Sequence, residues 1–155
     1  MQLKGVYEFA APVERVWAVL MDTTAIAACL PGCRELRDLG EDRYQAELVV
    51  VVAAITGNYG ATIAIEDKVP PRSYRLAMQG TGRTGFVKGA ATIALEPVAN
   101  GTAVHVDANA DVGGAIARVG QRLIEGVART TMNRFFACLA STALLREASN
   151  RIEPG

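Results

Sequence analysis

The sequence lacks any excess of charge of one sign, because sixteen Lys and Arg residues balance sixteen Asp and Glu residues in a chain of 155. The chain has neither a net positive charge nor a local run of basic residues that would attract phosphate groups, so we expect no nucleic-acid partner. The chain also lacks a long apolar run: its longest, residues 48–55, is far short of the roughly 20 residues of a membrane helix, and no apolar signal segment follows Met1. We therefore expect a soluble, cytoplasmic protein.

Histidine and cysteine are also scarce, with one and three residues respectively. The three cysteines are an odd number, which favours a reducing compartment over a disulfide framework. Cys29 and Cys33 are four residues apart, but Pro31 lies between them and the single histidine, His105, is far along the chain. We expect no metal site and no cofactor, and we expect Cys138 in the core. His105 falls on the expected solvent face of a strand, away from any recognised nucleophile motif, so we assign no catalytic residue.

The length suits a single domain, which we place at residues 1–147, followed by a short tail at 148–155. At its start, apolar residues alternate with polar ones, the period of a strand with one buried face. Pro12 then opens a helix, because proline is tolerated in a first helical turn. Asp22 or Thr23 can cap a second short helix, which must end by Leu30 because Pro31 follows.

Strand patterns fill the chain from Cys33 to Val112, with breaks at 40–42, 56–58, 69–72, 80–85 and 97–101. Short breaks of this kind join neighbouring antiparallel strands. We count six further strands and predict a seven-stranded antiparallel sheet. In its last strand, alternate residues from Val104 to Val112 share one face, and His105, Asp107, Asn109 and Asp111 lie on the other.

A long helix is expected over Gly113–Arg146, which contains no proline. Polar residues recur on one stripe at steps of three and four, and an apolar stripe runs opposite. Gly120 falls in the middle of the apolar stripe, where glycine costs about 1 kcal/mol relative to alanine in a helix interior. Beyond Thr131 the pattern is apolar nearly all round except for Arg134, which either extends its charge to solvent or places it at a pocket mouth.

The sheet and the long helix form an α+β pair of layers whose inward positions are small: Gly89, Ala91, Ala108, Ala110 and Gly120. Either the layers pack very closely, or a curved sheet stands off the helix and leaves an apolar cavity that accepts apolar guests. We favour the cavity.

Two motifs resemble known sites without fitting them. Residues 80–85 (GTGRTG) match a dinucleotide-binding glycine pattern, but a strand follows where that chemistry requires a helix N-terminus. We expect a glycine-rich hairpin there. Asp107, Asn109 and Asp111 have the spacing of a calcium loop, but Val112 stands in place of its glycine and Arg118 in place of its glutamate.

Several strings resemble the family of the carbon monoxide dehydrogenase G subunit, and the order of elements resembles the START-like (SRPBCC) helix-grip fold. The strings are Pro12–Trp17 (PVERVW), Leu30–Cys33 (LPGC), Gly57–Gly60 (GNYG), Asp67–Pro71 (DKVPP) with Tyr74, and Gly113–Ile124 (GGAIARVGQRLI). The resemblance implies a seven-stranded sheet wrapped around a long C-terminal helix, with two short helices after the first strand.

The resemblance further implies a non-catalytic accessory protein that carries an apolar or lipidic ligand, such as a quinone. Its partner would be a molybdenum-containing dehydrogenase, through which it could lie peripherally at the inner membrane. Relatives of this family often continue into a Pro/Ala-rich tail with an apolar anchor, whereas this sequence stops at Pro154 and Gly155, so we do not expect direct membrane anchoring. Together with the small inward positions, these considerations give the expected ligand-binding residues: Leu30, Pro31, Tyr59, Gly89, Ala91, Ile116, Gly120, Leu123, Ile124, Val127 and Arg134.

The alternative is a small enzyme of the same fold, a cyclase or aromatase acting on an aromatic or polyketide-like substrate. Such an enzyme needs polar groups that converge inside the cavity. The candidates are Tyr7, Tyr44, Tyr59, Tyr74 and Arg134. No inward Asp, Glu or His accompanies them, so the pattern favours the carrier.

Overall fold

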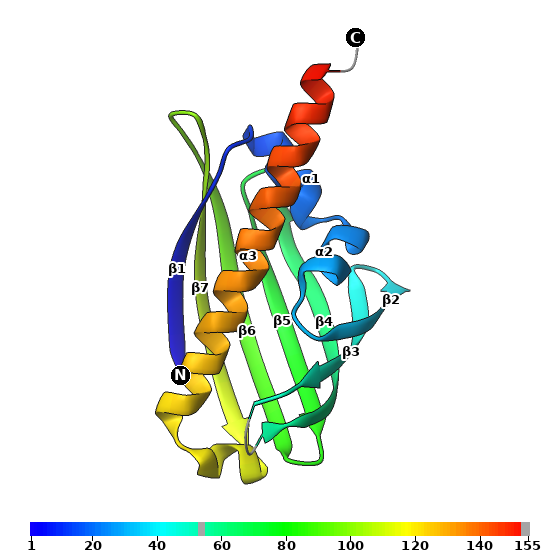
Figure 1. Cartoon of the computed structure of the whole chain (residues 1–155), viewed down its shortest axis with the longest axis vertical. Helices are drawn as coiled ribbons and strands as arrows, with labels where there is room; N and C mark the ends of the chain where they lie inside the picture. Colours follow the sequence, from blue (N-terminus) through cyan, green and yellow to red (C-terminus); the bar gives the residue numbers. More distant parts are fainter. Residues whose placement is uncertain (53–54, 153–155) are drawn as a thin grey trace.

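The computed structural model describes residues 1–52 and 55–152, which form one curved sheet with a long helix laid across it (Figure 1). The elements follow in the order β1 (Gln2–Phe9), α1 (Val13–Leu20), α2 (Thr23–Cys29), β2 (Cys33–Gly40), β3 (Arg43–Val50), β4 (Gly57–Val69), β5 (Ser73–Gly82), β6 (Gly85–Val98), β7 (Gly101–Gly113), the 3-10 helix η2 (Gly114–Val119) and α3 (Gln121–Ile152).

The sheet has seven strands in the order β1-β7-β6-β5-β4-β3-β2, and every neighbouring pair is antiparallel. This confirms the predicted sheet, the two short helices after β1 and the long C-terminal helix. Residues 80–85 lie at the β5–β6 hairpin, as expected, with Gly82 opposite Gly85.

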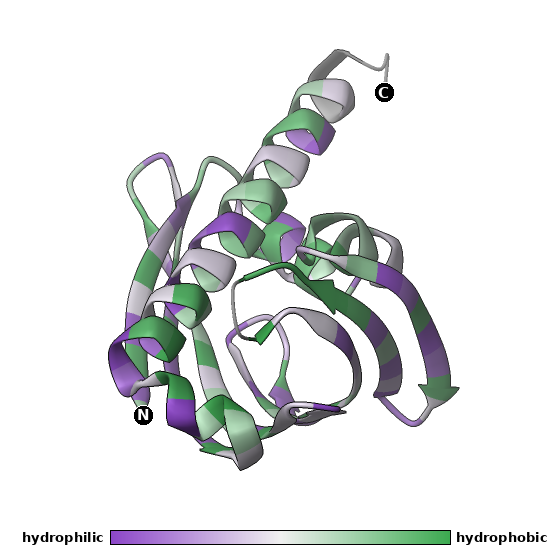
Figure 2. Cartoon of the chain, turned by 60° about the horizontal axis from the view of Figure 1, so that its bottom comes forward, coloured by the Kyte–Doolittle hydropathy of each residue, from purple (hydrophilic) through white to green (hydrophobic). Residues whose placement is uncertain are grey.

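The inner face of the sheet carries the apolar half of each strand. In β1, Leu3 and Phe9 are buried; in β7, Val104 and Val106 are buried, whereas His105 between them is exposed. The hydropathy colours alternate along several strands as the sheet curves around α3 (Figure 2). The period-2 pattern therefore assigned the faces correctly.

The two short helices begin and end where their sequences require. Pro12 is the N-cap of α1, and the Asp22 side chain accepts hydrogen bonds from the backbone N–H groups of Thr24 (2.9 Å) and Ala25 (3.4 Å) at the start of α2. After α2, the Cys33 N–H donates to the Leu30 carbonyl (3.1 Å) across Pro31 and Gly32. Gly32 has φ +75, and a Cβ there would collide with the carbonyl oxygen of Val49, so only glycine suits this turn.

The long helix starts later than predicted. Gly114–Val119 forms η2, and Gly120 follows with φ +102, so α3 begins at Gln121 rather than at Gly113. A residue with this left-handed φ lies outside a right-handed helix, and glycine adopts it without steric cost. Gly120 is thus a junction between two helices. At the other end α3 continues to Ile152, so the expected boundary between domain and tail at residues 147 and 148 falls within the helix.

The expectation of unpaired cysteines is also wrong. Cys29 of α2 and Cys138 of α3 form a disulfide with their Cα atoms 5.4 Å apart, while Cys33 is free and half-buried. The residues are 109 positions apart, so the pairing depends on the docking of α2 against α3. A count of cysteines does not contain that tertiary information.

Candidate ligand-binding site

A cavity of about 270 Å³ lies between the inner face of the sheet, the two short helices and α3. Its volume is close to the lower end of the roughly 300–1,000 Å³ typical of small-molecule sites. Five parts of the chain build its wall. The lining residues are Leu3 of β1; Leu20, Ile26 and Leu30 of α1, α2 and the turn after it; Leu36, Tyr44, Ile63, Ile65, Tyr74, Leu76 and Met78 of β2 to β5; Gly89, Ala90, Ala91, Ile93, Val106, Ala108, Asn109 and Ala110 of β6 and β7; and Met132, Phe135 and Phe136 of α3.

Small residues on β6 and β7 leave the space that a normal core would fill. Gly89 pairs with Ala110, and Ala91 pairs with Ala108, so two adjacent rows of the sheet present almost no side chain to α3. A Cβ on Gly89 would lie 2.8 Å from the Asn109 carbonyl oxygen, so the backbones approach too closely there for a larger residue. The sheet cannot fill this region from its own side, because its neighbours in register are equally short.

Aromatic side chains of α3 form the opposite wall. The ring of Phe136 stacks on Tyr7, with centroids 4.6 Å apart, and packs edge-on against Phe135 at 5.2 Å. The Tyr7 hydroxyl donates to the Asn133 side-chain oxygen at 2.7 Å, which ties β1 to α3 beside the rings. These contacts fix the wall in position without help from a ligand.

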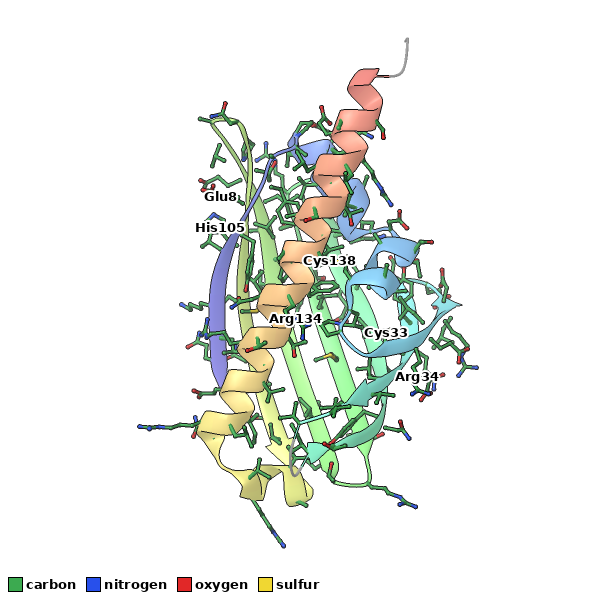
Figure 3. All side chains as sticks on the ribbon, in the orientation of Figure 1. Glu8, Cys33, Arg34, His105, Arg134 and Cys138 are labelled. Atoms are coloured by element: carbon green, nitrogen blue, oxygen red, sulfur yellow. A yellow bond between two sulfur atoms is a disulfide. The ribbon has the colours of Figure 1, made fainter. Side chains whose placement is uncertain are left out.

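The third wall is held by α2 and the turn that follows it. Ile26 and Leu30 line the cavity on either side of Cys29, whose disulfide fastens α2 to α3 (Cys138 is labelled in Figure 3). One end of the same helix is also held through Asp22, whose carboxylate lies 2.6 Å from the Arg146 guanidinium. The turn at residues 30–33 therefore borders the cavity through Leu30, while Pro31 is half-buried and Gly32 exposed.

The polar side chains of the wall are few and uncharged. They are Tyr44, Tyr74 and Asn109, and Asn109 itself is exposed on a strand whose neighbouring residues face inward. Tyr74 is only 5% exposed, and its ring packs edge-on against Trp17 with centroids 5.5 Å apart. Burial raises the pKa of the Tyr74 phenol well above its ordinary value, so the group stays protonated.

Three of the eleven expected ligand-binding residues line this cavity: Leu30, Gly89 and Ala91. Four others, Tyr59, Ile116, Ile124 and Val127, pack in a second, smaller hydrophobic cluster near η2. The remaining four, Pro31, Gly120, Leu123 and Arg134, lie outside both the cavity wall and that cluster. Gly120 is exposed and no atom lies within 4 Å of a Cβ placed on it, so the space that it leaves is solvent.

Arg134 is exposed on α3, and no described residue forms an ion pair with it (Figure 3). Met132, Phe135 and Phe136 line the cavity but are not among the residues expected from the sequence. The sequence does carry a signal for them. A helix that packs on one sheet face needs only one apolar stripe, whereas this segment is apolar nearly all round and has two adjacent aromatic residues.

The motifs that resemble other sites lie away from the cavity. His105 is on the outer face, 3.6 Å from the carboxylate of Glu96, and the figure shows it beside Glu8 at the edge of the sheet (Figure 3). Asp107 and Asp111 are also exposed on that face. Within the described residues no group of three or more His, Cys, Asp or Glu side chains could hold a metal ion. In the same part of the chain, no helix is both long and apolar enough to span a membrane.

The antiparallel sheet, the helix across it and the cavity between them define a protein of the START-like helix-grip class. Solved structures agree with this assignment. A START superfamily protein from Mycobacterium smegmatis matches with a TM-score of 0.72 and 12% identity, covering 93% of this chain and 97% of that one. A Thermus thermophilus protein matches with a TM-score of 0.70 and 15% identity, covering 94% and 99% of the respective chains. At these identities the likeness concerns the fold.

The chain belongs to the CoxG family, that of the carbon monoxide dehydrogenase G subunit, whose model matches residues 5–144. A conserved protein from Geobacillus kaustophilus is 36% identical, with a TM-score of 0.89 and coverage of 93% of this chain and 95% of that one. A comparison with curated proteins gave no match. The family and the fold together suggest an accessory, ligand-binding role.

Proposed function

We propose that this protein is a non-catalytic carrier that binds an apolar or lipidic molecule, such as a quinone, in the cavity between the sheet and α3. The observation that carries the proposal is the composition of the wall, which is apolar apart from two tyrosines and one exposed asparagine. An apolar cavity that its own walls keep open binds an apolar guest favourably, because the guest leaves water and makes van der Waals contacts with the wall.

We further propose that the ligand-loaded protein serves a molybdenum-containing dehydrogenase of the carbon monoxide dehydrogenase type. The family assignment supports this partner. Contact with a membrane would then occur through the dehydrogenase, at the cytoplasmic side of the inner membrane. The wall residues Leu30, Gly89 and Ala91 are the sequence-predicted positions that we retain for ligand binding.

The carrier fits the cavity better than a cyclase or aromatase does. Two of the five polar candidates for catalysis have partners that hold them elsewhere: the Tyr7 hydroxyl donates to Asn133, and the Tyr59 hydroxyl donates to the Ile55 carbonyl at 2.6 Å. A third, Arg134, is exposed on α3. The two tyrosines that remain in the wall, Tyr44 and Tyr74, provide neither a carboxylate or imidazole as general base nor a counter-charge.

The test is native mass spectrometry and solvent extraction of the purified protein, before and after incubation with a panel of quinones and fatty acids. We expect one bound molecule per chain for at least one member of the panel. Absence of any bound or extracted molecule across the panel would contradict the carrier. Mixing the loaded protein with a molybdenum-containing carbon monoxide dehydrogenase on a size-exclusion column tests the partner, and independent elution of the two would contradict that part.

A further inference from the structure

The disulfide between Cys29 and Cys138 lies beside the cavity. Ile26 precedes Cys29 by three residues and Leu30 follows it directly, and both of these neighbours line the cavity. Figure 3 labels Cys138 on the stretch of α3 that passes the two short helices. The crosslink therefore fixes the position of the wall residues that α2 and the turn after it contribute.

The two ends of α2 are attached to α3 in different ways. At its start, the Asp22 carboxylate lies 2.6 Å from the Arg146 guanidinium, a contact that does not depend on redox state. At its end, α2 is held by the disulfide, and no ion pair between described residues joins this end to α3. The turn beyond stays on the sheet, because the Val49 N–H donates to the Gly32 carbonyl at 2.9 Å. Breaking the disulfide thus frees the end of α2 next to Leu30 while both flanks remain anchored.

The disulfide is placed so that it can be opened and closed. Cys29 is 6% exposed, whereas Cys138 is half-buried, so a reductant reaches Cys138 more easily. The Thr142 hydroxyl lies 3.9 Å from the Cys29 sulfur and donates to the Cys138 carbonyl at 3.0 Å. Its oxygen is then able to accept a hydrogen bond from a Cys29 thiol, so the reduced form has a partner for the thiol that it buries.

In the cytoplasmic location proposed above, thiols are kept reduced, and the disulfides that do form are mostly transient or redox-sensing. We propose that Cys29 and Cys138 form a redox-modification site that controls ligand release. The oxidised protein holds the ligand, and reduction by a protein dithiol loosens the wall at Ile26 and Leu30 and lets the ligand leave. The inference rests on the proposed carrier function and adds its regulation.

The reaction is a thiol–disulfide exchange. A thiolate of the dithiol attacks the Cys138 sulfur, forms a mixed disulfide with it and breaks the bond to Cys29, which leaves as a thiolate and takes up a proton. The second thiol of the reductant then attacks its own partner sulfur in the mixed disulfide and releases Cys138, which is protonated in turn. The protein gains two electrons and two protons, and the dithiol is oxidised to a disulfide.

The effect on binding follows from pre-organisation. A wall that is fixed before the ligand arrives loses less freedom on binding than a mobile wall, so the oxidised form should bind more tightly and release more slowly. Coupling of this kind is reciprocal: a bound ligand must make the disulfide harder to reduce by the same factor. We expect about a tenfold effect, toward the lower end of the range for coupled sites, because reduction loosens only a small part of the wall.

The test uses N-phenyl-1-naphthylamine, a neutral apolar probe whose fluorescence rises when it leaves water. Its dissociation constant and release rate are measured with the oxidised protein and after reduction by dithiothreitol. We expect weaker binding and faster release after reduction. In mixtures of reduced and oxidised dithiothreitol, saturating probe should shift the point of half reduction by the same factor as the dissociation constant, which a crosslink without influence on the cavity would not do.

The decisive variant replaces both Cys29 and Cys138 by alanine, with Cys33→Ala as its matched control. The double variant should bind and release the probe as the reduced wild-type protein does, with or without dithiothreitol, whereas Cys33→Ala should respond to dithiothreitol as the wild-type protein does. Melting curves check that each form is folded at the assay temperature. If the double variant does not fold, the reduced wild-type protein gives the same comparison.

The outcomes separate the switch from the carrier. Equal affinity and release in the oxidised and reduced forms would overturn the switch and leave the carrier intact. A disulfide that dithiothreitol opens only when the protein unfolds, or a response that disappears in Cys33→Ala, would also overturn it. Failure of both forms to bind the probe would contradict the carrier, and the switch with it.

Discussion

The two halves of α3 are attached to the rest of the molecule in different ways. From Phe136 to Ala143 the helix packs into the main core: Leu139 and Ala143 are completely buried, and the disulfide at Cys138 joins the helix to α2. From Gln121 to Thr131 it has one partly buried apolar edge, and Leu123 is 38% exposed. Figure 1 shows the first half near β1 and the second beside α1 and α2.

The cavity lies against the segment where these two halves meet, at Met132, Phe135 and Phe136. The second half of α3, which is packed in the core, therefore holds this wall of the cavity in place and maintains the shape of the site. We expect the first half to contribute less to stability.

The largest expected effect comes from the disulfide. Replacing both Cys29 and Cys138 by alanine should lower the free energy of unfolding by about 2–5 kcal/mol, the typical cost of removing a native crosslink across a long loop. Denaturant unfolding of the double variant against the wild-type protein measures the loss. Cys33→Ala is the control, since Cys33 is unpaired. If the control and the double variant were equally stable, the crosslink would not hold the second half of α3.

Truncating one leucine in each half should sharpen the contrast. Leu139→Ala removes a fully buried side chain and should cost about 2–5 kcal/mol, whereas Leu123→Ala, at a partly exposed position, should cost under about 1 kcal/mol. Thermal unfolding of the two variants gives the comparison directly. Equal losses would mean that both halves of α3 support the core alike.

The smallest effect concerns the ion pair that links Asp22 to Arg146. The hydrogen bond from the Arg146 guanidinium is the main cause that holds the pKa of Asp22 below its ordinary value. A depressed folded-state pKa stabilises the fold above the unfolded pKa of about 3.9, and that contribution disappears as the pH falls through the folded value. Both side chains are about a third exposed, so the effect should be at most about 1 kcal/mol.

Arg146→Gln tests this pair. The variant should be slightly less stable than the wild-type protein at neutral pH, and the difference should vanish in acid as Asp22 becomes protonated. Chemical denaturation at several pH values between neutral and about pH 3 measures the difference. A difference that stayed constant over this range would show that Arg146 acts through packing and not through its charge.

The sequence was sufficient for the elements that depend on local chemistry. Alternation predicted the faces of the strands, and Pro12 predicted the start of α1. The cap of α2 was left between Asp22 and Thr23, and Asp22 is the residue that provides it. The hydrophobic pattern was misleading where a glycine can serve more than one structural purpose. Gly120 looked like a gap in a helical stripe, but its positive φ makes it the junction between η2 and α3. Hydrophobic periodicity does not distinguish a gap in a helix face from a junction between two helices, because it carries no information about backbone dihedral angles.

The cavity could be anticipated but not placed. Small residues on β6 and β7 indicated a space, and Gly89 and Ala91 are indeed in its wall. Which residues face them depends on the register of the seven strands and on the rotation of α3, and neither follows from the sequence of one chain. The expected wall on α3 was therefore drawn about two turns too close to its N-terminus, at Leu123 to Val127 instead of Met132 to Phe136.

The central claim is that the space beside Ala91 is a binding cavity, and one pair of variants on β6 tests it most directly. Ala91 faces the cavity, and Ala94, three residues further, lies on the outer face opposite His105. We predict that Ala91→Leu fills the cavity, keeps or raises the melting temperature and abolishes uptake of the apolar ligand in native mass spectrometry, while Ala94→Leu binds as the wild-type protein does. Full uptake by a stable Ala91→Leu, or a melting temperature that falls as it would for overpacking of a closed core, would contradict the claim.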